Sequence, residues 1–254
     1  MNATDRQKTI RDAVTRLGSA RISELAHDLG VSLETIRRDI RPLVDRGELT
    51  KTHGAVFAPH AAREAPFERR MGENAEAKRA IAAHVAGLIA DGDSVMMDTG
   101  TTTSILAREL LSKRGLIIVT NSSDVARLLA TVNGNKVFMA GGELHGDDGA
   151  AFGDAANAFA RNFRTRHAII SIGAMDAETG PMDYRLAEAE FARTVLSCGE
   201  RRMIITDATK FGRSALVRVC GFEDFDLLVT DRAPPPELAE RLEAARTAVE
   251  IAYG

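Results

Sequence analysis

The most regular hydrophobic pattern in the N-terminal part of the chain follows Ser32. Ile36 and Ile40 recur at helical spacing and begin one apolar stripe. The hydroxyl of Ser32 can accept a backbone N–H bond and cap the first turn. The pattern therefore predicts an amphipathic helix that starts at this residue. Pro42 has no amide hydrogen and is expected to kink or end the helix near Arg41.

Weaker apolar repeats precede this helix, and an alternating segment follows it. Residues 4–17 and 24–29 have the spacing of short helices. Gly30 then suits a tight turn, because glycine adopts a left-handed backbone at little cost. Residues 48–57 have the composition of a β-hairpin. This order of elements predicts a winged helix-turn-helix domain over residues 1–57.

The polar face of the amphipathic helix is rich in arginine. Such a face suits the major groove of DNA, where an arginine can bond guanine bidentately. A solvated charged face on an ordinary helix is the alternative, and the flanking helices and hairpin favour DNA reading over it. Lys51 and His53 in the hairpin are expected to contact phosphates. The candidate DNA-contacting residues are Ser32, Thr35, Arg37, Arg38, Arg41, Lys51 and His53.

The pattern changes after this domain. Residues 58–72 begin with a run rich in proline and alanine that lacks apolar periodicity, and we interpret them as a linker. Across residues 73–254, short apolar runs of strand length alternate with helical patterns. The alternation predicts an α/β domain with a parallel sheet covered by helices on both faces.

Polar residues follow five of the predicted strands at their carboxyl ends, where open parallel sheets bind ligands. Gly100 and the threonines after it start a helix, whose free N–H groups suit a phosphate. Lys210 adds a positive charge, and carboxylates at this edge can accept bonds from sugar or polyol hydroxyls. The candidate effector-binding residues are Asp98, Gly100, Thr101, Thr102, Thr103, Asn121, Ser122, Gly142, Glu143, Asp176 and Lys210.

Each of these features also has a purely structural interpretation. Serine and threonine at helix starts are commonly caps, and Gly141 with Gly142 can serve only a turn. The convergence of five polar loops favours a small phosphorylated ligand with hydroxyl groups. Turnover stays open, because Lys210 with nearby carboxylates could support isomerisation of a sugar phosphate. The sequence has no catalytic triad, Walker-type loop or dinucleotide fingerprint, so no catalytic residue and no cofactor is assigned.

Charge and composition add three expectations. The net charge is −3, but the first 70 residues hold 13 Lys and Arg against 10 Asp and Glu, so the N-terminal part is mildly basic. The six histidines form no helical i, i+4 pair, and Cys198 and Cys220 lack metal or redox spacing, so no metal site is expected. The polar N-terminus and the lack of a bilayer-length apolar run predict a cytoplasmic protein without a membrane partner.

Several motifs resemble those of the DeoR family of bacterial transcriptional regulators. The motifs are Val31-Ser-x-x-Thr-Ile-Arg-Arg-Asp39, Thr52-His-Gly54, Asp98-x-Gly-Thr-Thr-Thr103, Thr120-Asn-Ser122, Gly141-Gly-Glu143 and Lys210-Phe-Gly212. The resemblance implies a winged helix-turn-helix followed by a ribose-5-phosphate-isomerase-like parallel-sheet domain that senses a sugar phosphate without converting it. Two positions depart from the family pattern. Ala55 stands where many members have a second glycine, and Ala192 stands where a lysine is common, which weakens the isomerase alternative.

The same resemblance implies a repressor of carbohydrate or polyol catabolism that a phosphorylated effector releases from operator DNA. Residues 210–215 and 230–236 are similar to segments of the subgroup that responds to glycerol 3-phosphate, which makes this ester the leading effector. Another sugar phosphate, or activation in place of repression, stays open. Because helix-turn-helix proteins generally read two half-sites, a homodimer or homotetramer is implied.

Overall fold

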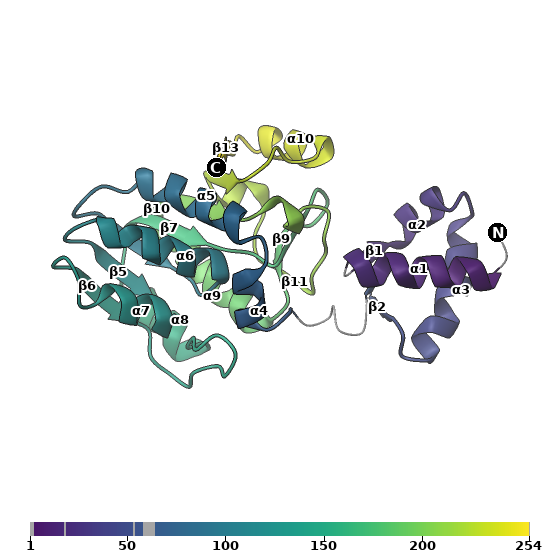
Figure 1. The fold of residues 1–254 in the computed structure, drawn as a ribbon, viewed down its shortest axis with the longest axis horizontal. Helices are drawn as coiled ribbons and strands as arrows, with labels where there is room; N and C mark the ends of the chain where they lie inside the picture. The colour runs from purple at the N-terminus through teal and green to yellow at the C-terminus, as the bar shows by residue number, and fades with distance from the viewer. Residues whose placement is uncertain (1–2, 18, 53, 58–63, 254) are drawn as a thin grey trace. The chain divides into compact units, whose positions relative to one another are not determined.

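The computed structural model describes residues 3–17, 19–52, 54–57 and 64–253. The chain forms two compact units, which we call the head and the body (Figure 1). The head comprises the N-terminal 65 residues, and the body comprises residues 66–212 and 217–254. No helix within the described ranges is long and apolar enough to cross a membrane.

The described part of the head contains three helices and a three-stranded antiparallel sheet, which confirms the predicted winged helix-turn-helix. The elements are α1 (Ala3–Leu17), β1 (Ser19–Arg21), α2 (Ile22–Asp28), α3 (Leu33–Asp45), β2 (Thr50–Thr52) and β3 (Ala55–Phe57). The strand order is β1-β3-β2. Ile10, Ile36 and Ile40 are fully buried in one core. β1 was not predicted, because three residues carry too little alternation to be recognised.

α3 passes through Pro42 and runs to Asp45, so it does not end near Arg41 as the sequence led us to expect. Proline removes one N–H donor. The turn after it is nevertheless held by the N–H of Arg46, which donates to the Pro42 carbonyl at 3.1 Å. Leu43 is buried in the head core and anchors this last turn. Burial of that side chain offsets the missing backbone bond.

A buried ion pair fixes the orientation of α3. The side chain of Asp39 is only 3% exposed, and Nε of Arg6 on α1 donates to its carboxylate at 2.7 Å. This hydrogen bond raises the pKa of Arg6. A buried carboxylate without a partner would cost free energy. The pair therefore holds the buried side of α3 against α1, while the arginines of α3 stay exposed.

The body is built on a seven-stranded sheet. Its strands are β4 (Ser94–Met97), β5 (Ile117–Thr120), β6 (Lys136–Met139), β7 (Thr165–Ile170), β10 (Gly199–Ile205), β12 (Leu227–Thr230) and β13 (Ala248–Ile251). Its α-helices are α4 (Phe67–Gly72), α5 (Ala75–Gly87), α6 (Thr101–Glu109), α7 (Ser123–Leu129), α8 (Asp154–Ala160), α9 (Leu186–Ser197) and α10 (Pro236–Ala244). All neighbouring strands pair in parallel, in the order β13-β12-β10-β7-β4-β5-β6. The predicted parallel-sheet domain is therefore confirmed.

Both faces of the sheet are buried at its central strands, which explains why these strands read as continuous apolar runs. Ile169 and Met203 belong to a core with α5, α6 and α7. Their chain neighbours Ile170 and Ile204 belong to a second core with α8, α9 and α10. Successive side chains of one strand thus enter opposite cores, and helices cover each face (Figure 1).

The body contains elements that the sequence pattern did not indicate. A small antiparallel sheet of β8 (Ala174–Asp176), β9 (Gly180–Asp183) and β11 (Val217–Arg218) follows the order β11-β9-β8. The strand β13 and the helix α10 were also missed. The predicted linker extended to residue 72, but α4 occupies residues 67–72 and lies in the body. These segments are short, and few of their positions are apolar and buried, so their hydrophobic pattern is weak.

A close approach between β10 and β7 yields a test of this packing. A Cβ added at Gly199 would lie 2.2 Å from Cβ of Ala168 and 2.9 Å from its backbone nitrogen. Gly199→Ala is therefore expected to lower the free energy of unfolding by about 1–3 kcal/mol. Urea unfolding followed by circular dichroism measures the change. Gly87→Ala is the control, because no atom lies within 4 Å of that Cβ. Equal unfolding midpoints for the two variants would contradict the close contact.

Candidate functional site

The order of the strands locates the crevice in which an α/β sheet binds ligands. From β4 the chain proceeds outward through β5 and β6, then returns to the other side of β4 as β7 and proceeds outward through β10 and β12. The carboxyl ends of β4 and β7 are therefore the topological switch point of the sheet. Asp98 follows β4, and Ser171 follows β7.

The two strand ends at the switch point are bound to each other. The N–H of Ser171 donates to both carboxylate oxygens of Asp98, at 3.1 and 3.2 Å. Gly100 precedes α6, and a Cβ there would lie 1.9 Å from Oγ of Ser171. Only glycine fits without moving that side chain. The predicted residues Thr101, Thr102 and Thr103 form the buried first turn of α6.

Asp98 is the centre of an acidic group. Burial raises its pKa well above the usual range, and the charges of Asp183 and Glu188 raise it further. The Ser171 N–H and the Thr103 hydroxyl act in the opposite direction. Asp183 itself accepts the N–H of Gly173 at 2.8 Å. Carboxyl groups gathered in this way can accept hydrogen bonds from the hydroxyls of a bound polyol.

Buried oxygens beside this group lack hydrogen-bond partners. Nδ2 of Asn121 donates to the Ala151 carbonyl at 2.9 Å, but its Oδ1 has no partner among the described residues. The same holds for the hydroxyl oxygens of Thr99 and Ser104. Buried polar atoms are normally satisfied, so these atoms suit a ligand or water. Ser122 differs, because its Oγ accepts the Val125 N–H and caps α7.

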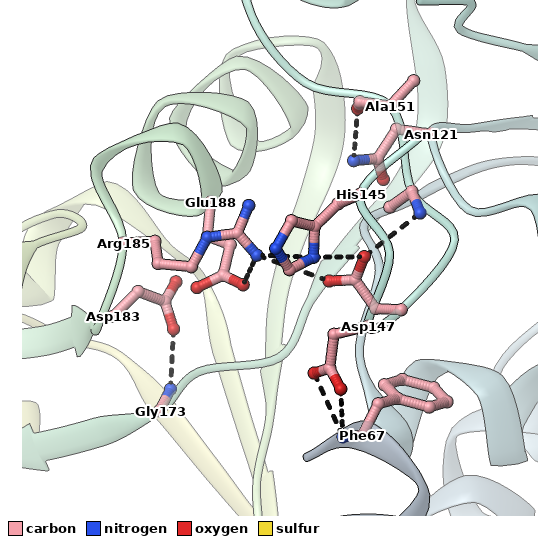
Figure 2. Close-up of polar contacts among 11 residues, drawn as sticks. Phe67, Asn121, His145, Asp147, Ala151, Gly173, Asp183, Arg185 and Glu188 are labelled. Carbon is pink, nitrogen blue, oxygen red and sulfur yellow. Dashed lines mark hydrogen bonds and ion pairs between the residues drawn. The ribbon is translucent and has the colours of Figure 1, made fainter. Parts of the chain in front are cut away.

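Arg185, which the sequence did not single out, joins α9 to the loop that follows β6 (Figure 2). Its Nη1 lies 3.1 Å from the Glu188 carboxylate and 3.0 Å from Nδ1 of His145. It also lies 3.8 Å from the buried carboxylate of Asp148, and its guanidinium stacks over Phe152 at 4.9 Å. The loop and the acidic group are therefore linked through one cation.

A cationic group lies where β10 ends. Lys210 belongs to a short 3-10 helix, Ala208–Lys210, that Asp207 caps. Lys78 of α5, also missed from the sequence, is 97% buried and donates to the Arg70 carbonyl. Burial lowers the pKa of Lys78, the charge of Asp207 opposes this, and the charge of Lys210 lowers it further. An anion beside these lysines would offset the burial of Lys78 and the repulsion by Lys210, which both lower the pKa of Lys78.

The position of Lys78 could have been recognised. It lies three, four and seven residues before the apolar positions 81, 82 and 85 of the same helix, so a lysine occupies a place in the buried stripe. For Arg185 the sequence held no comparable signal, since its contacts to His145, Asp148 and Phe152 are to residues distant in the chain.

The predicted effector residues Gly142, Glu143 and Asp176 do not directly follow β4 or β7, the two strands of the switch point. Gly142 and Glu143 are exposed on the loop after β6, whose contact with the acidic group runs through His145 and Asp148. Asp176 ends β8, and its Oδ1 accepts the N–H groups of residues 178 and 179 in the hairpin turn to β9. The small sheet thus places Asp176 away from the end of a main-sheet strand.

The second candidate site lies on the head. Ser32 caps α3 by accepting the Thr35 N–H at 3.1 Å. Beyond this turn, a hollow of about 570 Å³ has cationic side chains along its lining: Arg37, Arg38, Arg41 and Lys51. The three arginines are exposed, and Arg37 lies 3.7 Å from Glu34. His53 lies outside the described residues. Four cations from the helix and the wing on one surface suit a nucleic-acid backbone and groove.

Comparison with known families decides the classification. The DeoR-like helix-turn-helix domain matches residues 6–61, and the DeoR C terminal sensor domain matches residues 73–232. The chain belongs to the DeoR family. This membership makes it a transcriptional regulator and not an enzyme, so the isomerase alternative falls away.

DeoR relatives match nearly the whole chain. The HTH-type transcriptional repressor CsqR of Escherichia coli (strain K12) is 34% identical over 91% of this chain and 88% of its own. The Glycerol-3-phosphate regulon repressor of the same organism is 30% identical over 99% of this chain and 100% of its own.

A likeness to solved structures is weaker. Ribose 5-phosphate isomerase A of Methanocaldococcus jannaschii aligns with 55% of each chain at 14% identity and a TM-score of 0.40. We draw no conclusion from a likeness of this size. The fold of this DeoR protein is assigned from its own sheet order and from the family match.

The buried Asp98 yields a pH-dependent prediction. Because its folded-state pKa is raised, its contribution to stability is present below the ordinary aspartate pKa and is lost as the pH rises through the raised value. Asp98→Asn avoids this loss and can still accept the Ser171 N–H. We expect the variant to melt above the wild type near pH 7, with the difference vanishing towards about pH 4. Thermal unfolding across this range, without ligand, checks it; a difference independent of pH would contradict the assignment.

Proposed function

We propose that this DeoR regulator is a DNA-binding repressor of carbohydrate or polyol catabolism. A phosphorylated effector at the switch point of the body releases it from operator DNA in the cytoplasm. Glycerol 3-phosphate is the first candidate. The full-length match to the Glycerol-3-phosphate regulon repressor supports this choice, as does the site chemistry.

The observation that carries the proposal is the pairing of opposite chemistries at one sheet edge. Asp98, Asp183 and Glu188 offer acceptors for hydroxyl groups. Lys78 and Lys210 offer positive charge, and the N-terminus of α6 between the strand ends adds free N–H groups. A ligand with hydroxyls at one end and a phosphate at the other satisfies both groups. A neutral sugar would offer no anionic group to the two lysines.

We assign the effector site to some of the residues expected from the sequence. To these we add Lys78, Asp183 and Glu188, which the structure brings to the same end of the sheet. Gly100 and the first turn of α6 would hold the phosphate with Lys78 and Lys210. Asp98 and Asn121 would bind hydroxyls with the acids of β9 and α9. The residues are Lys78, Asp98, Gly100, Thr101, Thr102, Thr103, Asn121, Asp183, Glu188 and Lys210.

On the head, the exposed arginines of α3 would read base edges, while Ser32, Thr35 and Lys51 contact the backbone of the operator. His53 stays a proposal from the sequence alone. A helix-turn-helix generally occupies two half-sites, so we propose a homodimer or homotetramer. Because binding free energies are linked, DNA must weaken effector binding by the same factor by which the effector weakens DNA binding.

The effector is tested by titrating DNA from upstream of the gene, with and without phosphate esters. Anisotropy should show operator affinity falling by about 5- to 150-fold with glycerol 3-phosphate. Glycerol and inorganic phosphate alone should have little effect. Lys210→Gln should keep operator affinity and lose most of this response. If a different ester acts, the effector is reassigned at the same site; if no ester acts, the proposed sensing is wrong.

Operator reading is tested on the head. Arg38→Ala should weaken operator binding by about 1–3 kcal/mol if the side chain reads a base. Arg11→Ala removes the same charge from α1, where Arg11 pairs with Asp12 and Glu48, and serves as the matched control. Operator and scrambled duplexes are compared for both variants by anisotropy. Equal losses for the two variants would show that α3 contributes net charge without base reading.

A further inference from the structure

The helix α4 is the first element of the body after the linker, and little apolar contact holds it. None of its residues is fully buried. Met71 packs only partly against the core. An element with so few buried side chains depends on polar bonds for its position and can shift at low cost.

The first polar bond fixes the start of α4. The N–H of Phe67 donates to both carboxylate oxygens of Asp147, at 3.1 and 3.2 Å (Figure 2). Asp147 belongs to the loop after β6 and is adjacent in the chain to Asp148. Arg185 binds that same loop through Asp148 and His145, and it binds Glu188 of the acidic group. The start of α4 is therefore connected to the site in three steps.

The second polar bond fixes the other half of α4. Lys78 donates to the carbonyl of Arg70, and its charge interacts with Asp207 and Lys210. The bonds from Asp147 and from Lys78 to α4 thus lead to groups assigned to the effector site, one on its acidic side and one on its cationic side.

We propose that α4 is the transmission element of the repressor, held in the effector-free state by Asp147 and Lys78. This inference rests on the proposed function and says how effector binding would be transmitted within the body. A phosphate beside Lys78 competes with the Arg70 carbonyl for the ammonium group. A hydroxyl bound to Glu188 competes with Arg185 and so changes the position of the cation that contacts His145 and Asp148, in the loop that carries Asp147. Effector binding therefore favours a state in which α4 is released, and this difference in contacts is what a ligand needs to shift an equilibrium.

Asp147→Ala tests the proposal, because Asp147 contacts α4 without being part of the effector site. In the full-length chain, the variant should bind glycerol 3-phosphate within about twofold of the wild type by calorimetry. Its operator affinity should change with the ester by less than about a third of the wild-type factor. Asp147→Asn keeps an acceptor oxygen and should recover part of the response.

Asp91→Ala is the matched control. Asp91 also accepts one backbone N–H, that of Arg114 at 2.9 Å, but it lies before β4, at the opposite edge of the sheet. It should retain the full response, and circular dichroism confirms the fold of each variant. A wild-type response in Asp147→Ala overturns the role of α4 and leaves the proposed function standing. No response of the wild-type chain to any ester overturns both.

Discussion

The reversal of strand order between β4 and β7 is the constraint on which the body depends. After β4 the chain continues to the β5 side of the sheet, and after β7 it continues to the β10 side, so no single crossover helix covers the space beyond the ends of these two strands. The chain closes the base of that space with the hydrogen bonds from the Ser171 N–H to the Asp98 carboxylate, beside which only a glycine fits at position 100. The other groups of the site are arranged around this contact. The Asp98 carboxyl group that makes the contact is also the acid of the site whose pKa is raised well above its usual range.

The effector-free site is electrostatically unfavourable in a way that suits a sensor. The charges of Asp183 and Glu188 act on a buried carboxyl on one side, and on the other the charge of Lys210 acts on a buried lysine that Asp207 only partly compensates for its burial. Each group stands where a ligand of opposite character would stabilise it. The fold tolerates this arrangement because the apolar cores on both faces of the sheet are large and independent of the site. The free energy of ligand binding can therefore drive a conformational change in the body without unfolding its cores.

The sequence was sufficient for elements whose burial is periodic. The stripe behind Ile36 and Ile40 indicated α3, and the apolar runs of the strands indicated the parallel sheet, since both patterns record contact with a core. Asp98, Gly100 and the first turn of α6 were recognised because they follow a strand directly. Arg185 and Asp183 were not, because their role arises from contacts between loops distant in the chain. Asp176 was expected in a loop after a strand of the main sheet, and it lies instead at the end of the three-residue strand β8, where it accepts N–H groups of the hairpin turn.

The bonds from Asp147 and Lys78 to α4 both engage its main chain, the N–H of Phe67 and the carbonyl of Arg70. Any residue other than proline supplies the N–H, and every residue supplies the carbonyl. Substitutions within α4, other than to proline at position 67, therefore leave these two bonds in place, whereas substitution of Asp147 or Lys78 removes one of them. In an evolving lineage the sequence of this helix could drift, or adapt to a different linker, with its attachment to the sensor intact.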